Sequence, residues 1–191
     1  MQMIIATNNA HKLTEITGIL AGRYDLVSLK QAGIDVDVEE TGTTLLANAL
    51  LKAKTISDLS GQIALADDTG LSVDALDGAP GVYSARYAGE QHDDKANRAL
   101  LLTNMKGLPW EQRTAHFGTC IVVYYPDGHY IVANGRVDGY ILDHEEGDRG
   151  FGYDSLFWST ELGKTFASAT QEEKNSVSHR GRALMDLVSK L

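Results

Sequence analysis

The sequence predicts a single α/β domain spanning residues 1–191. Short apolar runs typical of buried strands alternate with longer segments whose apolar residues recur at helical spacing. With 43% apolar and 23% charged residues, the composition is that of a soluble globular protein. A chain of 191 residues is also long enough to form one hydrophobic core.

The first half of the chain predicts three strands and two helices. Each strand is a short apolar or alternating run, and both helices show an apolar face at 3.6-residue spacing. The first helix follows a turn of residues that commonly cap helices, Thr7, Asn8 and Asn9. The strands are expected at 1–6, 24–29 and 63–66, and the helices at about 10–22 and 43–59.

The second half predicts a helix, a hairpin, one further strand and a C-terminal helix. The helix at 93–105 is expected to stop at the Gly-Leu-Pro sequence of 107–109. The hairpin pairs 114–125 with 130–133 around Pro126, Asp127 and Gly128. A separate strand is expected at 135–142.

Two adjacent carboxylates, Asp67 and Asp68, follow the apolar run 63–66. Successive strand side chains point to opposite faces, so the two can share one pocket only if the strand ends or bulges there. We expect Thr69 and Gly70 to end it. Carboxylates at the end of a buried strand are costly unless a cation or hydrogen-bond donors meet them. The pair predicts either a turn that Asp caps or a site for a hard cation such as Mg²⁺.

Basic side chains lie at helix starts, where the helix dipole disfavours them. Lys12 is in the first turn of the first helix, and His179 with Arg180 begins the last one. An anion on the exposed N–H groups would account for them, although a solvated Lys12 is the alternative. On local grounds Lys52 is interpreted as a surface lysine. The sequence has no Gly-rich phosphate loop or dinucleotide fingerprint.

Glycines flank aromatic residues in the segment 150–154 (GFGYD). A glycine beside an aromatic residue lets the backbone approach a ligand closely, and it also serves a plain bend. Both interpretations of this segment are open.

Charge and hydropathy limit the partners. A net charge of −9 argues against a broad nucleic-acid surface or an anionic membrane partner. No apolar run approaches the ~20 residues of a membrane span, and the N-terminal residues lack the basic region of a signal peptide. The single Cys120 lies in an apolar run and is expected to be a buried thiol. We therefore expect a cytoplasmic protein.

Six motifs follow one another along nearly the whole chain. They are 7–12 (TNNAHK), 39–42 (EETG) with 48–49 and 52–53, 66–71 (ADDTGL), 78–81 (GAPG) with 83–87 (YSARY), 150–154 (GFGYD), and 172–175 (EEKN) with 178–180 (SHR). In this order they resemble the Ham1/inosine-triphosphatase family, the pyrophosphatases of non-standard purine nucleoside triphosphates.

The resemblance implies a two-lobed α/β fold with a long mixed, twisted sheet flanked by helices, a central cleft and a homodimer. It also implies Mg²⁺-dependent hydrolysis of ITP, dITP and XTP at the α–β phosphoanhydride, giving the monophosphate and pyrophosphate and so cleansing the nucleotide pool. A pyrophosphatase of the same fold that acts on other modified nucleoside triphosphates is the alternative. No nucleic-acid or membrane partner is expected.

The resemblance also implies the site residues. Asp68 and Lys12 are the catalytic candidates, with a water near Asp68 attacking the α-phosphorus. Asp68 is expected to bind Mg²⁺ together with Asp67, Glu39 or Glu40. The charge of the triphosphate is balanced by the basic side chains of Lys12, Lys52, Lys174 and Arg180. Phe151 stacks on the purine, and the edge of the base is read by Asp154, His179 and Arg180. The substrate-binding candidates are Thr7, Asn8, Asn9, Ala10, His11, Lys12, Lys52, Thr69, Phe151, Gly152, Tyr153, Asp154, Lys174, His179 and Arg180.

Two positions depart from the family pattern. Ala47 stands where many relatives carry Glu, so any role of that carboxylate is absent. Ser155 stands where relatives commonly have Pro, and we expect a looser loop there.

Two other functional classes fit parts of the pattern. A haloacid-dehalogenase-like phosphatase also uses two aspartates and Mg²⁺, but its aspartates lie two residues apart, whereas Asp67 and Asp68 are adjacent. That class would release phosphate. A non-catalytic nucleotide sensor would bind nucleotide without turnover and would lack the metal carboxylates.

Overall fold

The computed structural model describes residues 2–89 and 93–191; Met1, which the first predicted strand includes, lies outside them. The chain divides into two compact units. The first holds the described residues up to Asp68 together with Thr119–Gly135 and Arg180–Leu191. The second holds the described residues of Thr69–Gly118 together with Arg136–His179.

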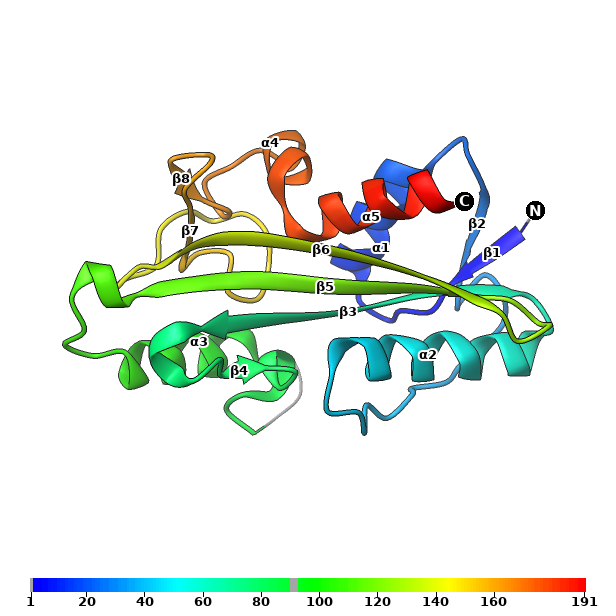
Figure 1. Cartoon of the computed structure of the whole chain (residues 1–191), viewed down its shortest axis with the longest axis horizontal. Helices are drawn as coiled ribbons and strands as arrows, with labels where there is room; N and C mark the ends of the chain where they lie inside the picture. Colours follow the sequence, from blue (N-terminus) through cyan, green and yellow to red (C-terminus); the bar gives the residue numbers. More distant parts are fainter. Residues whose placement is uncertain (1, 90–92) are drawn as a thin grey trace. The chain divides into compact units, whose positions relative to one another are not determined.

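The strands form one mixed, eight-stranded sheet in the order β2-β1-β3-β5-β6-β7-β8, with β4 paired to β3 beside this path (Figure 1). β1 runs parallel to both β2 and β3, whereas β4, β7 and β8 pair antiparallel with their neighbours. The predicted α/β class is therefore confirmed. The strands are β1 (Gln2–Ile5), β2 (Asp25–Ser28), β3 (Ile63–Val73), β4 (Pro80–Gly81), β5 (Thr114–Tyr124), β6 (Tyr130–Ile141), β7 (Phe157–Ser159) and β8 (Lys164–Thr165).

In the first unit, alternate strand residues enter two different cores, as the period of two in a strand requires. Ile63 and Leu65 of β3 pack with residues of α1 (Ala10–Leu20) and α5 (His179–Lys190). Ala64 and Ala66 pack with residues of α2 (Leu45–Ser60). Figure 1 shows α1 and α5 on one side of these strands and α2 on the other.

The second unit has one main core, which α3 (Asp94–Asn104) helps to form. Leu101 of this helix packs with Leu71 of β3, Phe117 of β5 and Phe157 of β7. The remaining helix, α4 (Gln171–Val177), begins with a capping box at Thr170. Three short 3₁₀ turns complete the elements: Asp74–Leu76, Ser84–Arg86 and Trp110–Gln112.

Two sequence predictions about the strands are wrong, and the short elements β4, β7, β8 and α4 were not predicted. β3 does not end at Thr69 and Gly70 but continues to Val73, because the short strand β4 folds back and pairs with it. The strands predicted at 130–133 and 135–142 are one continuous strand, β6. The helix α4, which has only seven residues, was not predicted; so short a segment shows too few apolar repeats to reveal itself.

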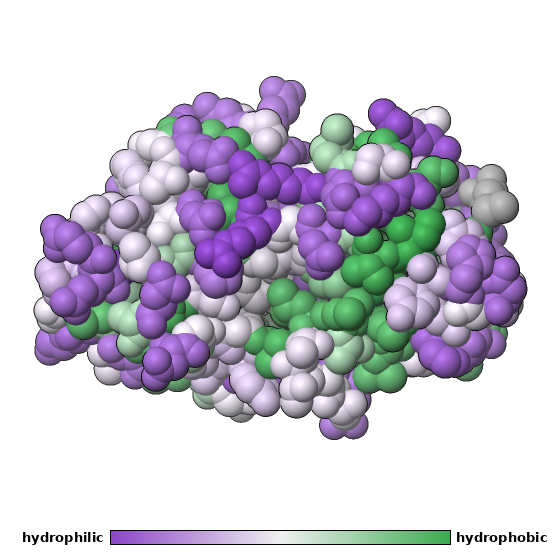
Figure 2. Space-filling view, viewed as in Figure 1, coloured by the Kyte–Doolittle hydropathy of each residue, from purple (hydrophilic) through white to green (hydrophobic). Residues whose placement is uncertain are grey.

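Polar side chains dominate one face of the surface (Figure 2), and the single cysteine is buried. Hydrophilic side chains cover much of the face shown in Figure 2, and hydrophobic ones gather in one area of it. Among the described residues, no helix is both long enough and apolar enough to cross a membrane. Cys120 is a buried free thiol, as predicted, and burial together with the nearby Asp68 and Asp67 raises its pKa to about 11.

Candidate active site

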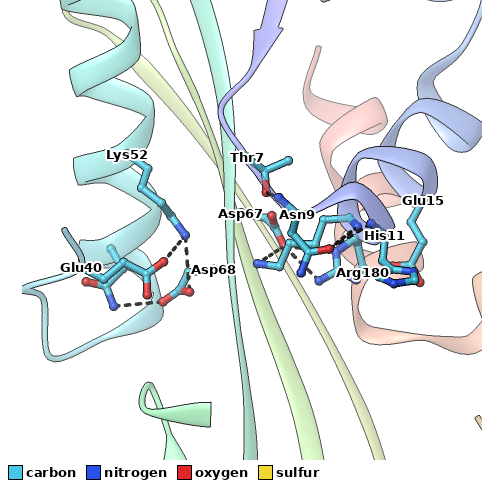
Figure 3. A network of polar contacts seen from close by, with 11 residues as sticks. Thr7, Asn9, His11, Glu15, Glu40, Lys52, Asp67, Asp68 and Arg180 are labelled. Atoms are coloured by element: carbon cyan, nitrogen blue, oxygen red, sulfur yellow. Dashed lines mark hydrogen bonds and ion pairs between the residues drawn. The ribbon is translucent and has the colours of Figure 1, made fainter. Parts of the chain in front are cut away.

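Asp67 and Asp68 lie on opposite faces of β3 (Figure 3). Asp67 continues the row of Ile63 and Leu65, which faces α1 and α5, and Asp68 continues the row of Ala64 and Ala66, which faces α2. Both side chains are buried. Because the strand runs straight through this point, the expectation that the two carboxylates could share a pocket at a strand end is wrong.

On the α1 side, Asp67 belongs to a buried network of four charges. Arg180 donates to its Oδ2 from Nε and from Nη2, at 3.1 Å each, and Lys12 Nζ lies 3.2 Å from the same oxygen. The third nitrogen of the guanidinium, Nη1, donates to Glu15 Oε2. Two cations therefore balance two carboxylates, as buried charges require.

This network keeps Asp67 ionised. Burial acts to raise the pKa of its carboxyl, but Lys12, Arg180 and Lys52 together hold that pKa well below its usual range. Burial lowers the pKa of Lys12, and the neighbouring Asp67 opposes this. The interpretation of Lys12 as a solvated lysine is wrong, since its side chain is only 15% exposed and is ion-paired.

The polar turn before α1 is a helix cap, as predicted. Asn9 Oδ1 accepts from the backbone N–H groups of His11 and Lys12, at 2.9 and 3.2 Å. Thr7 Oγ1 accepts from Asn9 N at 3.1 Å, and Asn8 Nδ2 donates to a backbone oxygen outside the turn. An anion at this helix start would thus compete with the Asn9 side chain for the same N–H groups. Ala10 and His11 are exposed.

On the α2 side, Asp68 meets an amide and a lysine. Asn48 Nδ2 donates to Asp68 Oδ2 at 3.1 Å. Lys52 Nζ lies 3.6 Å from Asp68 Oδ1 and donates to Glu40 Oε1 at 2.6 Å. Lys52 therefore bridges two carboxylates and is 13% exposed, so its interpretation as a surface lysine is wrong.

The pKa shifts on this face differ from those around Asp67. Burial raises the pKa of Asp68, and the ammonium of Lys52 only partly offsets this. Burial acts to lower the pKa of Lys52, but Asp68, Asp67 and Glu40 together raise it. Asp68 is therefore less firmly ionised than Asp67, although the two are consecutive in the chain.

Glu40 and Asp68 are the carboxylates that fit a magnesium ion. Mg²⁺ is commonly held by one or two protein carboxylates together with substrate phosphates. Both carboxylates contact the ammonium of Lys52, so the space between them already accommodates a positive charge. Glu39 is exposed and Asp67 faces the other way. Within the part of the chain that the structure describes, no three His, Cys, Asp or Glu side chains gather as a metal site.

In the second unit, Asp154, Lys174 and Phe151 form a second polar cluster. Asp154 Oδ2 accepts from Lys174 Nζ at 2.7 Å and from Phe151 N at 2.9 Å. The ammonium of Lys174 also lies over the Phe151 ring, 5.0 Å from its centre. At Gly150, where φ is +76°, a side-chain carbon would overlap Asp154, so a glycine here lets the Asp154 carboxylate pack closely against the backbone.

The other candidates of the second unit have different surroundings. His179 is buried and stacks on Phe117, with ring centres 4.6 Å apart. Tyr153 is buried, and its hydroxyl donates to Ser84 O at 2.8 Å. Gly152 N donates to a carboxylate of α3, and Thr69 is half-buried in β3.

The family model described as the Ham1 family matches residues 3–190. The chain belongs to the Ham1 family. It is 50% identical to a dITP/XTP pyrophosphatase of Leuconostoc mesenteroides, over 100% of this chain and 96% of the relative. The structure of the Staphylococcus aureus Ham1 protein matches with a TM-score of 0.89 and 38% identity, over 100% of this chain and 97% of that one. A HAM1 protein from Coxiella burnetii matches with a TM-score of 0.90 and 33% identity, over 100% and 98%.

Two basic motif residues of this Ham1 protein are paired with buried carboxylates. Arg180, expected to read the purine edge, is 1% exposed and bonded to Asp67 and Glu15. Lys174, expected near the phosphates, is paired with Asp154 in the second unit. Both cations are buried, and spacing in the sequence alone does not reveal their partners.

Two buried polar residues of this Ham1 protein were not among the predicted site residues. Glu15 lies beside Ile16 on the inner side of α1, and a charged residue among buried apolar ones was the available signal. Asn48 lies one turn before Lys52 on α2, and that spacing was its signal. A looser loop was expected at Ser155, where relatives commonly have proline. In the structure the Ser155 hydroxyl donates to Glu145 at 2.9 Å, a hydrogen bond that proline could not make.

Proposed function

We propose that this chain hydrolyses the non-standard purine nucleoside triphosphates ITP, dITP and XTP at the α–β phosphoanhydride. The products are the nucleoside monophosphate and pyrophosphate, and the enzyme is a hydrolase that cleanses the nucleotide pool. The relative from Leuconostoc mesenteroides, named a dITP/XTP pyrophosphatase, supports the substrate class. The observation that carries the chemistry is the ion-paired group of the buried Asp68 with the partly buried Glu40 and Lys52.

Lys12 and Lys52 receive the triphosphate. Each ammonium is held by a carboxylate in the structure, so its charge is in place before the substrate arrives. When Lys12 turns to a phosphate, Asp67 keeps both hydrogen bonds from Arg180 and does not become an unpaired buried charge. In this proposal Arg180 anchors Asp67.

Asp68 directs the attacking water, and with Glu40 it would hold Mg²⁺. The bound metal would supply charge neutralisation of the leaving pyrophosphate and a lowered pKa for the attacking water. The carboxylate of Asp68 accepts a hydrogen bond from the water and aims it at the α-phosphorus. Lys52 stabilises the charge that develops on the phosphate oxygens.

The second unit selects the base. Phe151 stacks on the purine, and Lys174 with His179 supplies donors for the 6-oxo group. We assign Lys174 to the base and not to the phosphates, because Asp154 and the Phe151 ring hold its ammonium. The amino group of adenine would leave such donors unpaired, and a mismatch of this kind discriminates strongly.

A panel of nucleoside triphosphates with Mg²⁺, scored separately for phosphate and pyrophosphate, tests this function. We expect ITP, dITP and XTP to show far higher kcat/KM than ATP, with one pyrophosphate per monophosphate. Release of phosphate would favour a phosphatase, and tight binding without turnover would favour a nucleotide sensor. Comparable kcat/KM for ATP and ITP would refute the proposed selectivity.

We also propose that the enzyme is a cytoplasmic homodimer, on the family resemblance and on the single reduced cysteine. Light scattering tests the dimer. A mass that stays at the monomer value of 20.7 kDa over a wide concentration range would refute it.

A further inference from the structure

Asn48 is the fourth residue of α2 and is fully buried. Its backbone N–H bonds to Thr44 O at 3.1 Å, and the Thr44 side chain caps the helix by accepting from Ala47 N. The Asn48 side chain is therefore not needed to start the helix, and asparagine is a weaker helix former than alanine. Both of its polar atoms instead bond to residues outside the helix.

The orientation of the Asn48 amide follows from its two partners. Its Oδ1 accepts from Gly42 N at 2.8 Å, and only the carbonyl side of the amide can accept a hydrogen bond. Its Nδ2 therefore faces Asp68 and donates to Oδ2 at 3.1 Å. A side-chain carbon at Gly42 would lie 2.6 Å from Asn48 Oδ1, so this approach requires a glycine.

The bond from Asn48 occupies one oxygen of Asp68 and thereby places the other. Asp68 Oδ1 lies 3.6 Å from Lys52 Nζ, which in turn donates to Glu40 at 2.6 Å. Gly42 is two residues from Glu40 in the chain. A single buried amide therefore ties the segment that carries Glu40 to the strand that carries Asp68.

We propose that Asn48 is a positioning residue for the reaction, because its amide sets the rotation of Asp68 and the spacing between Asp68 and Glu40. The inference rests on the proposed function, which assigns these two carboxylates to Mg²⁺. Removal of a side chain that orients metal-binding carboxylates typically costs ~10–100-fold in metal affinity or activity.

The variant Asn48→Ala tests this role, and Asn97→Ala is its matched control. Asn97 is the fourth residue of α3, is 1% exposed, and also makes two side-chain bonds. Its amide accepts from Ala88 N at 2.7 Å and donates to Ala85 O at 3.2 Å, so both partners are backbone groups. The two substitutions remove the same chemistry from the same helix position, but only Asn48 contacts a carboxylate.

The first measurement is Mn²⁺ binding to the nucleotide-free protein, followed by electron paramagnetic resonance, with Mn²⁺ standing in for Mg²⁺. We expect Asn48→Ala to bind Mn²⁺ ~10–100-fold more weakly than wild type and to lose a similar factor in kcat with ITP. Asn97→Ala should melt at a lower temperature yet bind Mn²⁺ as wild type does. Equal Mn²⁺ affinity in Asn48→Ala and wild type would overturn the proposal. A wild type that binds no Mn²⁺ would overturn it as well.

An exchange of donor and acceptor separates positioning from stability. In the double variant Asn48→Asp with Asp68→Asn, the amide and the carboxylate swap places and the hydrogen bond can re-form. We expect its melting temperature to exceed that of Asn48→Asp alone, while Mn²⁺ affinity stays low. Full recovery of Mn²⁺ affinity would show that the position of the carboxylate is unimportant and would overturn the inference. If wild type binds Mn²⁺ but does not hydrolyse ITP, the proposed function fails while these comparisons still decide the role of Asn48.

Discussion

Asp67 and Asp68 are consecutive residues of β3, and their carboxylates point to opposite faces of the strand (Figure 3). Asp67 is bonded to Arg180 and paired with Lys12, whereas Asp68 is bonded to Asn48 and lies beside Lys52. Two identical side chains therefore have different surroundings one residue apart. We expect Asp67 to stabilise the fold and Asp68 to take part in the reaction, and this difference can be measured.

Asp68→Asn should lower kcat for ITP by ~10²–10⁴-fold while the protein stays folded, because the amide cannot supply the charge that orients the water and the metal. The change is nearly isosteric, and the new side chain can still accept from Asn48. Since burial raises the pKa of Asp68, the charged form is disfavoured in the fold, and the variant should melt no lower than wild type at neutral pH. Steady-state kinetics and a melting curve check both statements. Retention of more than about a tenth of wild-type kcat would place the catalytic carboxylate elsewhere.

Asp67→Asn should cost stability more than rate. The substitution removes the carboxylate that pairs with both Arg180 and Lys12, and breaking a buried pair costs about 3 kcal/mol or more. Urea unfolding measures this loss, and kcat of the folded fraction is the control. A variant as stable as wild type but inactive would contradict the assignment of Asp67 as an anchor.

The stabilisation by Asp67 should disappear in acid. Its pKa in the fold lies below its unfolded value of about 3.9, so its contribution is fully present above that value. The contribution is lost as pH falls through the lower folded pKa, because the proton must then be bound in both states. Urea unfolding of wild type and Asp67→Asn at pH 7, 4 and 3 should therefore give free energies whose difference is largest at pH 7 and begins to narrow below pH ~4. A difference that stays constant down to pH 3 would argue against this linkage.

Phe151→Ala should raise KM for ITP by ~10-fold or more, because stacking of a base on an aromatic ring is worth about 1–3 kcal/mol. The ring also lies under the ammonium of Lys174, so selectivity for ITP over ATP should fall too. Tyr130→Ala is the control, since this exposed aromatic side chain belongs to the first unit. Unchanged KM in Phe151→Ala would remove the ring from the base site.

Local patterns predicted those parts of the fold that depend on neighbouring residues. The helix cap at Asn9 and the buried run of β3 both follow from adjacent side chains. The end of β3 was wrong because pairing with β4, which lies further along the chain, extends the strand past Gly70. From the local sequence alone, a glycine is interpreted as the end of a strand. Only the pairing with another strand shows that the strand continues.

The site was predictable as a set of residues but not as an arrangement. Motif resemblance supplied Lys12, Lys52 and Asp68, which the structure gathers in the first unit. It could not show that Arg180 turns to Asp67, because these residues are 113 positions apart in the sequence. Pairings at such separation are set by the fold, and one sequence contains no signal for them.

In the proposed reaction, water attacks the α-phosphorus and the bond to the β-phosphate breaks. Hydrolysis of ITP in ¹⁸O-labelled water, with the products analysed by mass spectrometry, tests it most directly. We expect pyrophosphate and a monophosphate as the products, with one ¹⁸O in the phosphate group of the monophosphate and none in pyrophosphate. Label in pyrophosphate, or release of phosphate and a nucleoside diphosphate, would contradict it.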